Sequence, residues 1–277
     1  MLRAMSNTSI RDKVVLITGA SSGIGASLAE RAAAKGAKVV LVARREAELK
    51  AVAARCGGDA NALAVVADVT KRADVQRALD EADARFGRVD AWVNNAGRGI
   101  TRPVLQITDE DVDEMMTVNL KSAIYGMQIA VAHFRTRGSG HLLNISSMLG
   151  RIPFASVRSI YSASKHALNS LTANLRVDLR QSDPSIHVTL VMPGVVATDF
   201  GLNAKHGGPD SRAMPTAQPV EEVADAIIGA IESPRAEVYT RPGFHAQIAA
   251  YYGAEDIATI ESNPPFAPPR GGNTPPR

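Results

Sequence analysis

A tyrosine and a lysine four positions apart form the pair of side chains in this sequence best suited to proton transfer. Tyr161 and Lys165 stand in the segment YSASK, and on a helix this spacing places both side chains on one face. A free tyrosine has a pKa near ~10, so the phenol alone is a poor base at neutral pH. Because a nearby cation stabilises phenolate, we expect Lys165 to lower the pKa of Tyr161 toward a useful range.

A glycine-rich segment close to the start of the chain indicates phosphate binding. The segment LITGASSGIG, residues 16–25, follows an apolar run and opens a helical pattern. In this position Gly19 allows a tight turn, Gly23 lets the backbone approach a pyrophosphate, and Gly25 allows the helix to pack closely on the strand. The free N–H groups at the start of the helix then favour a bound phosphate. The segment therefore predicts a dinucleotide site.

Short apolar runs alternate with helical patterns along the chain. The runs are mostly continuous, which indicates strands that are buried on both faces. This alternation predicts an α/β fold, a doubly wound (Rossmann-like) parallel sheet of about seven strands with helices on both faces. We expect the strands at residues 13–18, 37–43, 62–68, 89–95, 141–147, 186–192 and 237–240.

The pattern favours one domain over residues 12–255, with a flexible N-terminus at 1–11. We expect the proline-rich segment 256–277 to be a disordered tail. Residues 199–219 are polar and rich in Gly and Pro, and they are placed to serve as a substrate lid or as a plain surface connection. Thr108 and Asp111 predict a capping box for a long helix that runs through Asn119 toward Phe134.

Composition excludes several classes of function. The net charge is +3, and both signs interleave without a basic run, so we expect no nucleic-acid partner. Cys56 is the only cysteine, which rules out an intrachain disulfide and suits a reducing, cytoplasmic compartment. The six histidines lack metal-ligand spacing, so we expect no metal. No apolar run approaches the length of a membrane span, and the start of the sequence lacks the apolar core of a signal peptide.

Three motifs together resemble one family. TGxxxGIG at 18–25, NNAG at 94–97 and YxxxK at 161–165 occur in the order and context of the compact, single-domain short-chain dehydrogenases/reductases, and the resemblance covers roughly residues 12–240. It implies hydride transfer that interconverts a carbonyl and a secondary alcohol, with Tyr161 as general acid/base. It also implies that Lys165 holds the nicotinamide ribose, Ser147 hydrogen-bonds the substrate oxygen, and Asn119 holds a water that links Lys165 to solvent.

The end of the second strand favours NADP(H) over NAD(H). An acidic residue at Ala43 would bind the adenosine ribose 2′-hydroxyl, but VARRE at 42–46 has alanine there, followed by Arg44 and Arg45. A guanidinium can grip a 2′-phosphate with charge-assisted hydrogen bonds. Arg44 is the main candidate, and Arg45 and the Ser22 hydroxyl are secondary ones.

The resemblance extends the cofactor site to residues at several strand ends. The resemblance implies that Asp68 and Val69 frame the adenine and that Asn95, Ala96 and Gly97 line the cofactor after the fourth strand. It implies that the segment after the sixth strand binds the nicotinamide carboxamide. Asn94, by contrast, is expected to brace the sheet. The additional cofactor residues are Ser21, Ile24, Asp68, Val69, Asn95, Ala96, Gly97, Pro193, Gly194, Val196 and Thr198.

Two features leave alternatives open. Ser147 lies fourteen residues before Tyr161, one more than the family pattern usually has, so Ser146 is a second candidate and the loop 150–160 is one residue longer. The competing function is a non-catalytic NADP(H)-binding sensor, which should have lost Tyr161, Lys165 or Ser147. An epimerase or dehydratase on this fold would usually carry a larger C-terminal domain.

The substrate is predicted to be a small carbonyl or alcohol compound. Residues beside the motifs or in the predicted lid are the pocket candidates: Arg98, Met148, Phe154 and Phe200. The apolar members suit an uncharged substrate, whereas Arg98 would favour an acid group or point outward. The family resemblance also implies a homotetramer or homodimer in which the two long helices pack across a twofold axis.

Overall fold

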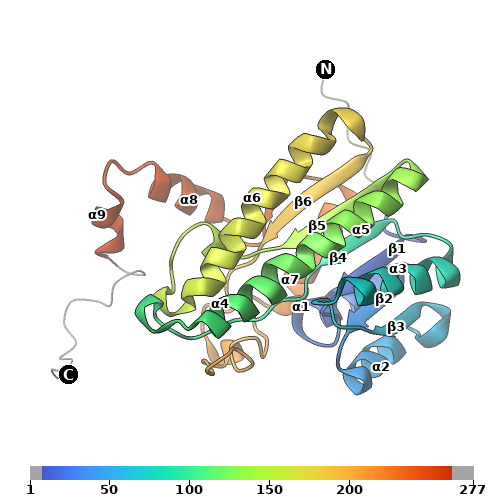
Figure 1. Cartoon of the computed structure of the whole chain (residues 1–277), viewed down its shortest axis with the longest axis horizontal. Coiled ribbons are helices and arrows are strands. Elements are labelled where there is room, and N and C mark those ends of the chain that lie inside the picture. Colours follow the sequence, from blue (N-terminus) through green and yellow to red (C-terminus); the bar gives the residue numbers. More distant parts are fainter. Residues whose placement is uncertain (1–7, 264–277) are drawn as a thin grey trace.

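The computed structural model describes residues 8–263 and contains one parallel sheet of seven strands in the order β3-β2-β1-β4-β5-β6-β7 (Figure 1). This confirms the predicted doubly wound sheet. The chain builds outward from β1 to β3 and then crosses back to β4, so the order reverses between β1 and β4. The strands are Val14–Thr18 (β1), Lys38–Ala43 (β2), Ala62–Val66 (β3), Ala91–Asn94 (β4), Gly140–Ile145 (β5), Ile186–Met192 (β6) and Glu237–Tyr239 (β7).

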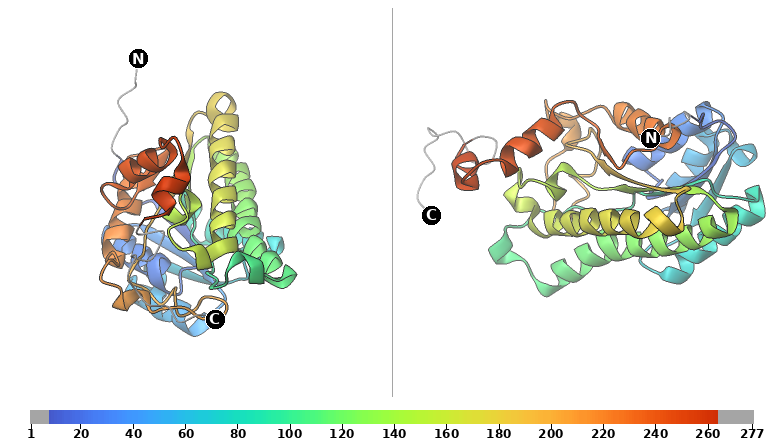
Figure 2. Two further views of the ribbon diagram at one scale, coloured as in Figure 1. Left: turned by 90° about the vertical axis from the view of Figure 1, so that its left-hand side faces the viewer. Right: turned by 90° about the horizontal axis from the view of Figure 1, so that it is seen from above.

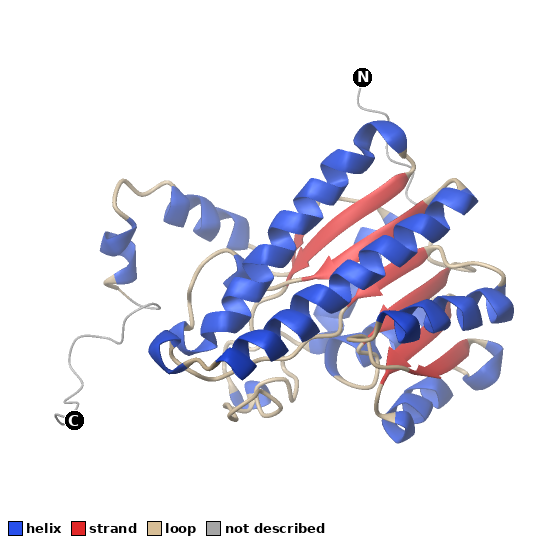
Figure 3. Cartoon of the chain, in the orientation of Figure 1, coloured by secondary structure: helices blue, strands red, loops and turns tan. Residues whose placement is uncertain are grey.

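Helices cover both faces of the sheet (Figures 2 and 3). Successive residues of β1 alternate between two cores, since Val15 packs toward one face and Leu16 toward the other. The first face carries α1 (Gly23–Ala34), α2 (Glu46–Arg55) and α7 (Val220–Glu232), and the second carries α3 (Arg72–Phe86), α5 (Ser122–Arg137) and α6 (Ser159–Ser182). Within residues 8–263, no helix is long and apolar enough to cross a membrane.

The predicted long helix through Asn119 is interrupted. It begins at Thr108, whose side chain and that of Asp111 form the expected capping box at the start of α4 (Asp109–Met116). A π-helical turn, Thr117–Lys121, then joins α4 to α5 and holds Asn119. Such π-helical turns inside α-helices are frequent at functional sites.

Both predicted ends of the domain were misplaced. The segment 8–11 packs against α7. The Thr8 N–H donates to the Glu232 carbonyl at 3.0 Å, and Ile10 is fully buried. At the other end, α8 (Phe244–Tyr252) is followed by α9 (Ile257–Glu261), which Asp256 caps, so the predicted disordered tail starts too early (Figure 1). The remaining parts of these two predictions, residues 1–7 and 264–277, lie outside the described residues.

A buried polar chain connects β4 to its neighbours. The Trp92 indole donates to Asn94 Oδ1 at 2.8 Å, and Asn94 Nδ2 donates to Asn144 Oδ1 at 2.9 Å on β5. Asn94 therefore braces the sheet, as predicted. Helix α5 lies against this chain at Gly126, where a Cβ atom would overlap Asn94 Oδ1 and lie 2.8 Å from Trp92 Nε1.

Two helical glycines are expected to respond oppositely to alanine. Gly126→Ala should lower the free energy of unfolding by about 2 kcal/mol, because the methyl group overpacks the Trp92–Asn94 contact. Gly229→Ala in α7 is the matched control, since no atom lies within 4 Å of the added Cβ, and it should raise the free energy by about 1 kcal/mol through helix propensity. Urea denaturation measures both, and a stable Gly126→Ala variant would contradict the packing described for α5.

Candidate active site

One cavity of about 1300 Å³ lies at the carboxyl ends of the strands. It begins at the glycine loop after β1, passes the reversal point between β1 and β4, and ends beside Tyr161 at the start of α6. Ligands bind at such a reversal point in open α/β sheets, because the loops diverge there and leave a crevice. The sequence predicted a site at this edge, and nearly all the predicted residues line the cavity.

The glycine loop has the backbone that its sequence predicts. Gly19 and Gly23 have φ angles of 68° and 55°, which side chains rarely tolerate. Gly25 packs without room for a Cβ, which would overlap the Gly19 carbonyl oxygen and lie 2.6 Å from Asn95 Nδ2. Gly25 therefore lies behind the cavity wall and holds the loop against the segment after β4, whereas Ser21, Ser22, Gly23 and Ile24 line the cavity.

The two arginines after β2 both reach the cavity but differ in their contacts. Arg45 Nη2 donates to Ser22 Oγ at 2.8 Å and to Ser21 Oγ at 3.0 Å, so its guanidinium lies at the glycine loop. Arg44 is exposed in the cavity wall and forms no hydrogen bond or ion pair with any residue the structure describes. Arg45 therefore contacts the glycine loop directly, although the sequence marked it only as a secondary candidate. The Arg44 guanidinium is left available for a ligand.

The remaining predicted cofactor residues come together from four strand ends. Asn95 holds the loop after β4 to β1, because its amide nitrogen donates to the Thr18 carbonyl at 2.8 Å. Asp68 accepts from the Thr70 N–H at 3.0 Å, which shapes the loop after β3. The members that line the cavity are Gly19, Asp68, Val69, Asn95, Ala96, Gly97, Pro193, Gly194, Val196 and Thr198.

The two candidate serines after β5 face different partners. Ser146 Oγ lies 2.5 Å from Asn169 Oδ1, so this hydroxyl bonds into α6. Ser147 Oγ accepts from the Leu149 N–H at 3.1 Å and also contacts the Tyr161 phenol. Ser147 is therefore the serine whose hydroxyl meets Tyr161 in the cavity, with the longer loop between them.

Lys165 is buried, and its ammonium has a backbone partner. Its Nζ atom donates to the Ile145 carbonyl at 2.9 Å, at the end of β5, and lies 5.7 Å from the centre of the Tyr161 ring. Burial lowers the pKa of Lys165 to about 8, because a charge removed from water is costly. The 5.7 Å separation places the ammonium close to Tyr161, as the helical spacing predicted.

The pKa of Tyr161 differs from the expectation. Burial raises it above the ordinary value, and this effect outweighs the lowering by the Ser147 hydroxyl and by the Arg158 guanidinium. The sequence reasoning credited Lys165 with the lowering and overlooked Arg158, three residues before the tyrosine. An arginine at that spacing on a helix start was the signal that could have identified it.

Asn119 lies behind the cavity wall and binds the loop after β4. Its Oδ1 accepts from the Arg98 N–H at 2.8 Å, and its Nδ2 donates to the Arg98 carbonyl at 3.0 Å and to Ser164 Oγ at 3.2 Å. A Cβ on Gly97 would lie 3.1 Å from Asn119 Oδ1 and 3.6 Å from Lys165 Nζ, so both polar groups converge on this glycine. The π-helical turn places the amide for these contacts.

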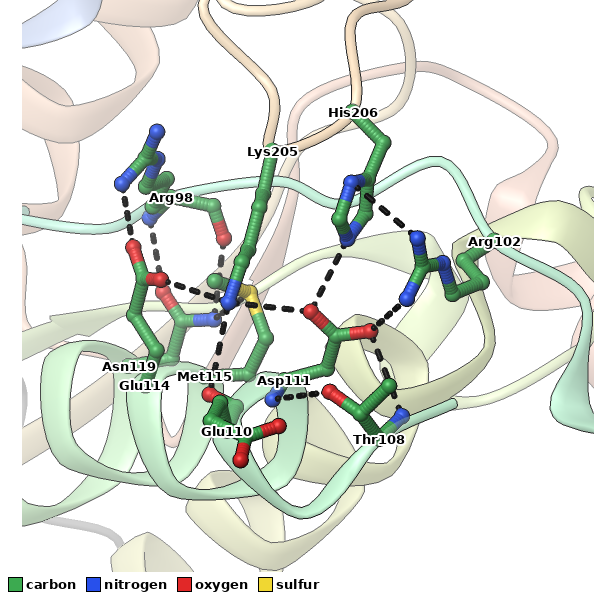
Figure 4. Close-up of polar contacts among 10 residues, drawn as sticks. All are labelled: Arg98, Arg102, Thr108, Glu110, Asp111, Glu114, Met115, Asn119, Lys205 and His206. Atoms are coloured by element: carbon green, nitrogen blue, oxygen red, sulfur yellow. Dashed lines mark hydrogen bonds and ion pairs between the residues drawn. The ribbon is translucent and has the colours of Figure 1, made fainter. Parts of the chain in front are cut away.

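A buried charge cluster joins the predicted lid to α4 (Figure 4). Asp111, with a side chain only 1% exposed, accepts from Lys205 Nζ and His206 Nε2 at 2.9 Å each and from Arg102 Nη1 at 2.9 Å. Burial acts to raise the pKa of Asp111, but the hydrogen bonds from His206 and Lys205 hold it well below its usual range. Glu114 forms ion pairs with both Lys205 and Arg98.

The end of the cavity beside Tyr161 is lined mainly by apolar side chains. Met148, Phe154, Phe200 and Arg98 line it as predicted, and the Phe200 ring lies 5.7 Å from the Tyr161 ring. Arg98 is not free to receive an acid group, because Glu114 pairs with it. The sequence reasoning also missed the contribution of α8 and α9, from which Phe244, Gln247, Ala250, Tyr251 and Ile260 line the cavity. No periodicity longer than a few residues marked these short helices.

A glycine loop at the reversal point of a parallel sheet is typical of dinucleotide-binding α/β proteins. The short chain dehydrogenase family model matches residues 13–207, so the chain belongs to the short-chain dehydrogenase/reductase family. An uncharacterized oxidoreductase, YxnA, of Bacillus subtilis is 38% identical over 88% of this chain and 69% of its own length.

Two solved structures have the same architecture. A short chain dehydrogenase/reductase from Burkholderia phymatum, in complex with NAD, has a TM-score of 0.81 and 26% identity, with 92% of this chain and 97% of that chain covered. A 3-ketoacyl-(acyl-carrier-protein) reductase from Brucella melitensis, complexed with NADH, has a TM-score of 0.74 and 31% identity over 83% of this chain and 97% of that chain.

Removing the centre of the charge cluster is expected to destabilise the protein. Asp111→Ala leaves Arg102, Lys205 and His206 without their buried partner and should lower the free energy of unfolding by about 3 kcal/mol at neutral pH. The carboxylate has a depressed pKa, so its contribution is present above the ordinary aspartate pKa and declines as the pH falls toward the native value. Asp113→Ala, exposed on the same helix, is the control and should change little. Equal effects of the two variants in urea denaturation would contradict this account.

Proposed function

We propose that this protein is an NADP(H)-dependent oxidoreductase that interconverts a carbonyl and a secondary alcohol, with Tyr161 as the general acid/base. The observation that carries the proposal is the meeting of Tyr161, Lys165 and Ser147 at one end of a cavity whose other end is a phosphate-type glycine loop. Family membership supports the reaction class, and the geometry supports the assignment of roles.

The described residues suit a nicotinamide dinucleotide. The loop at Gly19 and Gly23 presents backbone to the cavity without Cβ atoms, and the serines and arginines beside it offer donors to phosphate. When bound, the cofactor supplies or accepts the hydride. The segment after β6, with Thr198, and the segment after β4, with Asn95, would hold its nicotinamide half.

The chain's own residues handle the proton at the substrate oxygen. The Tyr161 hydroxyl donates a proton to the carbonyl oxygen during reduction and accepts it during oxidation. The Ser147 hydroxyl hydrogen-bonds the same oxygen as charge develops on it. Lys165 adds positive charge beside the phenol, and Asn119 fixes the loop at Gly97 against which the ammonium lies.

The cofactor preference rests on the end of β2. Both structural neighbours were solved with NAD or NADH, but this chain has Ala43 followed by Arg44 and Arg45 at the site. We propose that both guanidinium groups bind the 2′-phosphate, with Arg45 braced by Ser21 and Ser22. The alternative, a non-catalytic sensor, would predict the loss of a proton-transfer residue, and Tyr161, Lys165 and Ser147 are all present.

Nucleotide titration tests the cofactor preference. Wild-type protein should bind NADPH about tenfold more tightly than NADH, and Arg44→Ala and Arg45→Ala should each weaken NADPH binding about tenfold, because a charge-assisted hydrogen bond is lost. NADH binding should change less. Arg55→Ala, on the exposed end of α2 and paired with Glu30, is the matched control. Nicotinamide fluorescence gives the dissociation constants, and tighter binding of NADH by the wild type would refute the preference.

Replacing the phenol tests the chemistry. Tyr161→Phe should lower kcat for reduction of an aromatic ketone by about a hundredfold or more, because the proton donor is removed, while NADPH binding stays nearly unchanged. Tyr125→Phe on α5, where the ring stacks with Arg72 and does not line the cavity, serves as the control. Absorbance of NADPH follows the rate, and substantial turnover by Tyr161→Phe would exclude the acid/base role.

A further inference from the structure

Arg158 is a half-buried arginine in the cavity wall that has no acidic partner among residues 8–263. It ends the short 3-10 helix Ser156–Arg158, directly before α6, and its Nη1 atom donates to the Ile100 carbonyl at 3.1 Å. No carboxylate lies within ion-pair distance of it in the part of the chain that the structure describes. The other cations of this region differ, since Arg98 pairs with Glu114, and Arg102 and Lys205 pair with Asp111.

A buried hydroxyl group lies beside this guanidinium. The Thr101 hydroxyl is buried and has no hydrogen-bond partner among the described residues. A Cβ on Gly208 would lie 3.1 Å from both Arg158 Nη2 and Thr101 Oγ1, so the two side chains converge on one point of the wall. Thr101 and Arg158 both line the cavity. A buried hydroxyl without a hydrogen-bond partner, beside a half-buried guanidinium whose charge no carboxylate balances, is costly unless a ligand completes the pair.

Arg158 and Thr101 lie at the same end of the cavity as Tyr161, the proposed acid/base. Arg158 precedes Tyr161 by three residues, and its charge acts on the phenol to lower the pKa of Tyr161. A Cβ on Gly99 would lie 3.1 Å from Arg158 Nη1 and 2.9 Å from the ring of Phe200, which in turn packs near Tyr161. The guanidinium, Phe200 and Tyr161 therefore surround the same end of the cavity.

Resting on the proposed function, we infer that Arg158 and Thr101 form a subsite for a carboxylate carried by the substrate. The substrate class is then a carbonyl compound, or the matching alcohol, with an acidic group on the Arg158 side. Its apolar body would lie toward Met148, Phe154 and Tyr251. A guanidinium with a hydroxyl beside it suits a carboxylate, because both of its oxygens can accept charge-assisted hydrogen bonds.

The test compares two ketones that differ in one charge. The compounds 4-acetylbenzoate and methyl 4-acetylbenzoate share the aromatic ketone and differ in the carboxylate. Calorimetric titration of the full chain should give a dissociation constant about tenfold lower for the carboxylate, because hydrogen bonds to a charged group are lost with the ester. Binding needs no turnover, so this readout is independent of the proposed reaction.

Variants assign the difference to the two side chains. Arg158→Gln should remove the preference for the carboxylate and leave binding of the ester nearly unchanged. Thr101→Val should reduce the preference about threefold without destabilising the fold, because the deleted hydroxyl has no partner within the described residues. Thr101→Val also keeps the test decisive where Arg158→Gln fails to fold. Arg98→Gln is the matched cation control and should preserve the preference.

The outcomes separate the two proposals. Equal dissociation constants for the two ketones in wild-type protein, or failure to bind the carboxylate, overturn the subsite even where NADPH-dependent reduction occurs. A carboxylate preference that depends on Arg158, without any reduction of either ketone, supports the subsite and counts against the proposed reaction. An equal fall in kcat for both ketones in Arg158→Gln, with the binding preference intact, would show that Arg158 only tunes Tyr161 and would overturn the subsite.

Discussion

Burial of the Lys165 ammonium at the end of β5 is the constraint on which the rest of the site depends. Lys165 is only 4% exposed, and its ammonium donates to the Ile145 carbonyl at 2.9 Å. This contact requires the start of α6 to lie directly against the carboxyl end of β5. Since Tyr161 lies one turn earlier on α6 and Ser147 lies two residues beyond Ile145, a single contact brings the phenol and the hydroxyl to the same place.

Further polar contacts along α6 hold that position. Asn169 donates to the Gly150 carbonyl at 2.7 Å, and Asn144 on β5 donates to Thr172 Oγ1 at 2.9 Å. These contacts fix the start of α6 against β5 without any contribution from the loop between Ser147 and Tyr161. Because buried hydrogen bonds set the position of the helix on the strand, the loop that joins them can gain length at little cost.

The sequence was sufficient where a residue's role depends on local geometry. The continuous apolar runs predicted the strands, the glycines predicted the phosphate-type turn, and Thr108 with Asp111 predicted the helix cap, since each pattern acts within a few residues. It was insufficient where a role depends on a distant partner. Glu114 neutralises Arg98, whereas no acidic group within residues 8–263 pairs with Arg158, and nothing in the spacing of these arginines distinguishes them. Asp111 likewise has a second role with Lys205 and His206 that its cap position does not reveal.

The charges around Tyr161 also bear on the direction of proton transfer. Burial raises the pKa of the phenol, and Arg158 is the cation that opposes this effect. A substrate carboxylate paired with Arg158 would neutralise that guanidinium and remove its lowering influence, so the phenol would hold its proton more firmly. A protonated phenol beside a carbonyl is the arrangement needed to donate a proton as hydride adds to the carbon. The same anion site that selects an acidic substrate would therefore prepare Tyr161 for carbonyl reduction, and loss of the carboxylate would shift the phenol toward the base needed for alcohol oxidation.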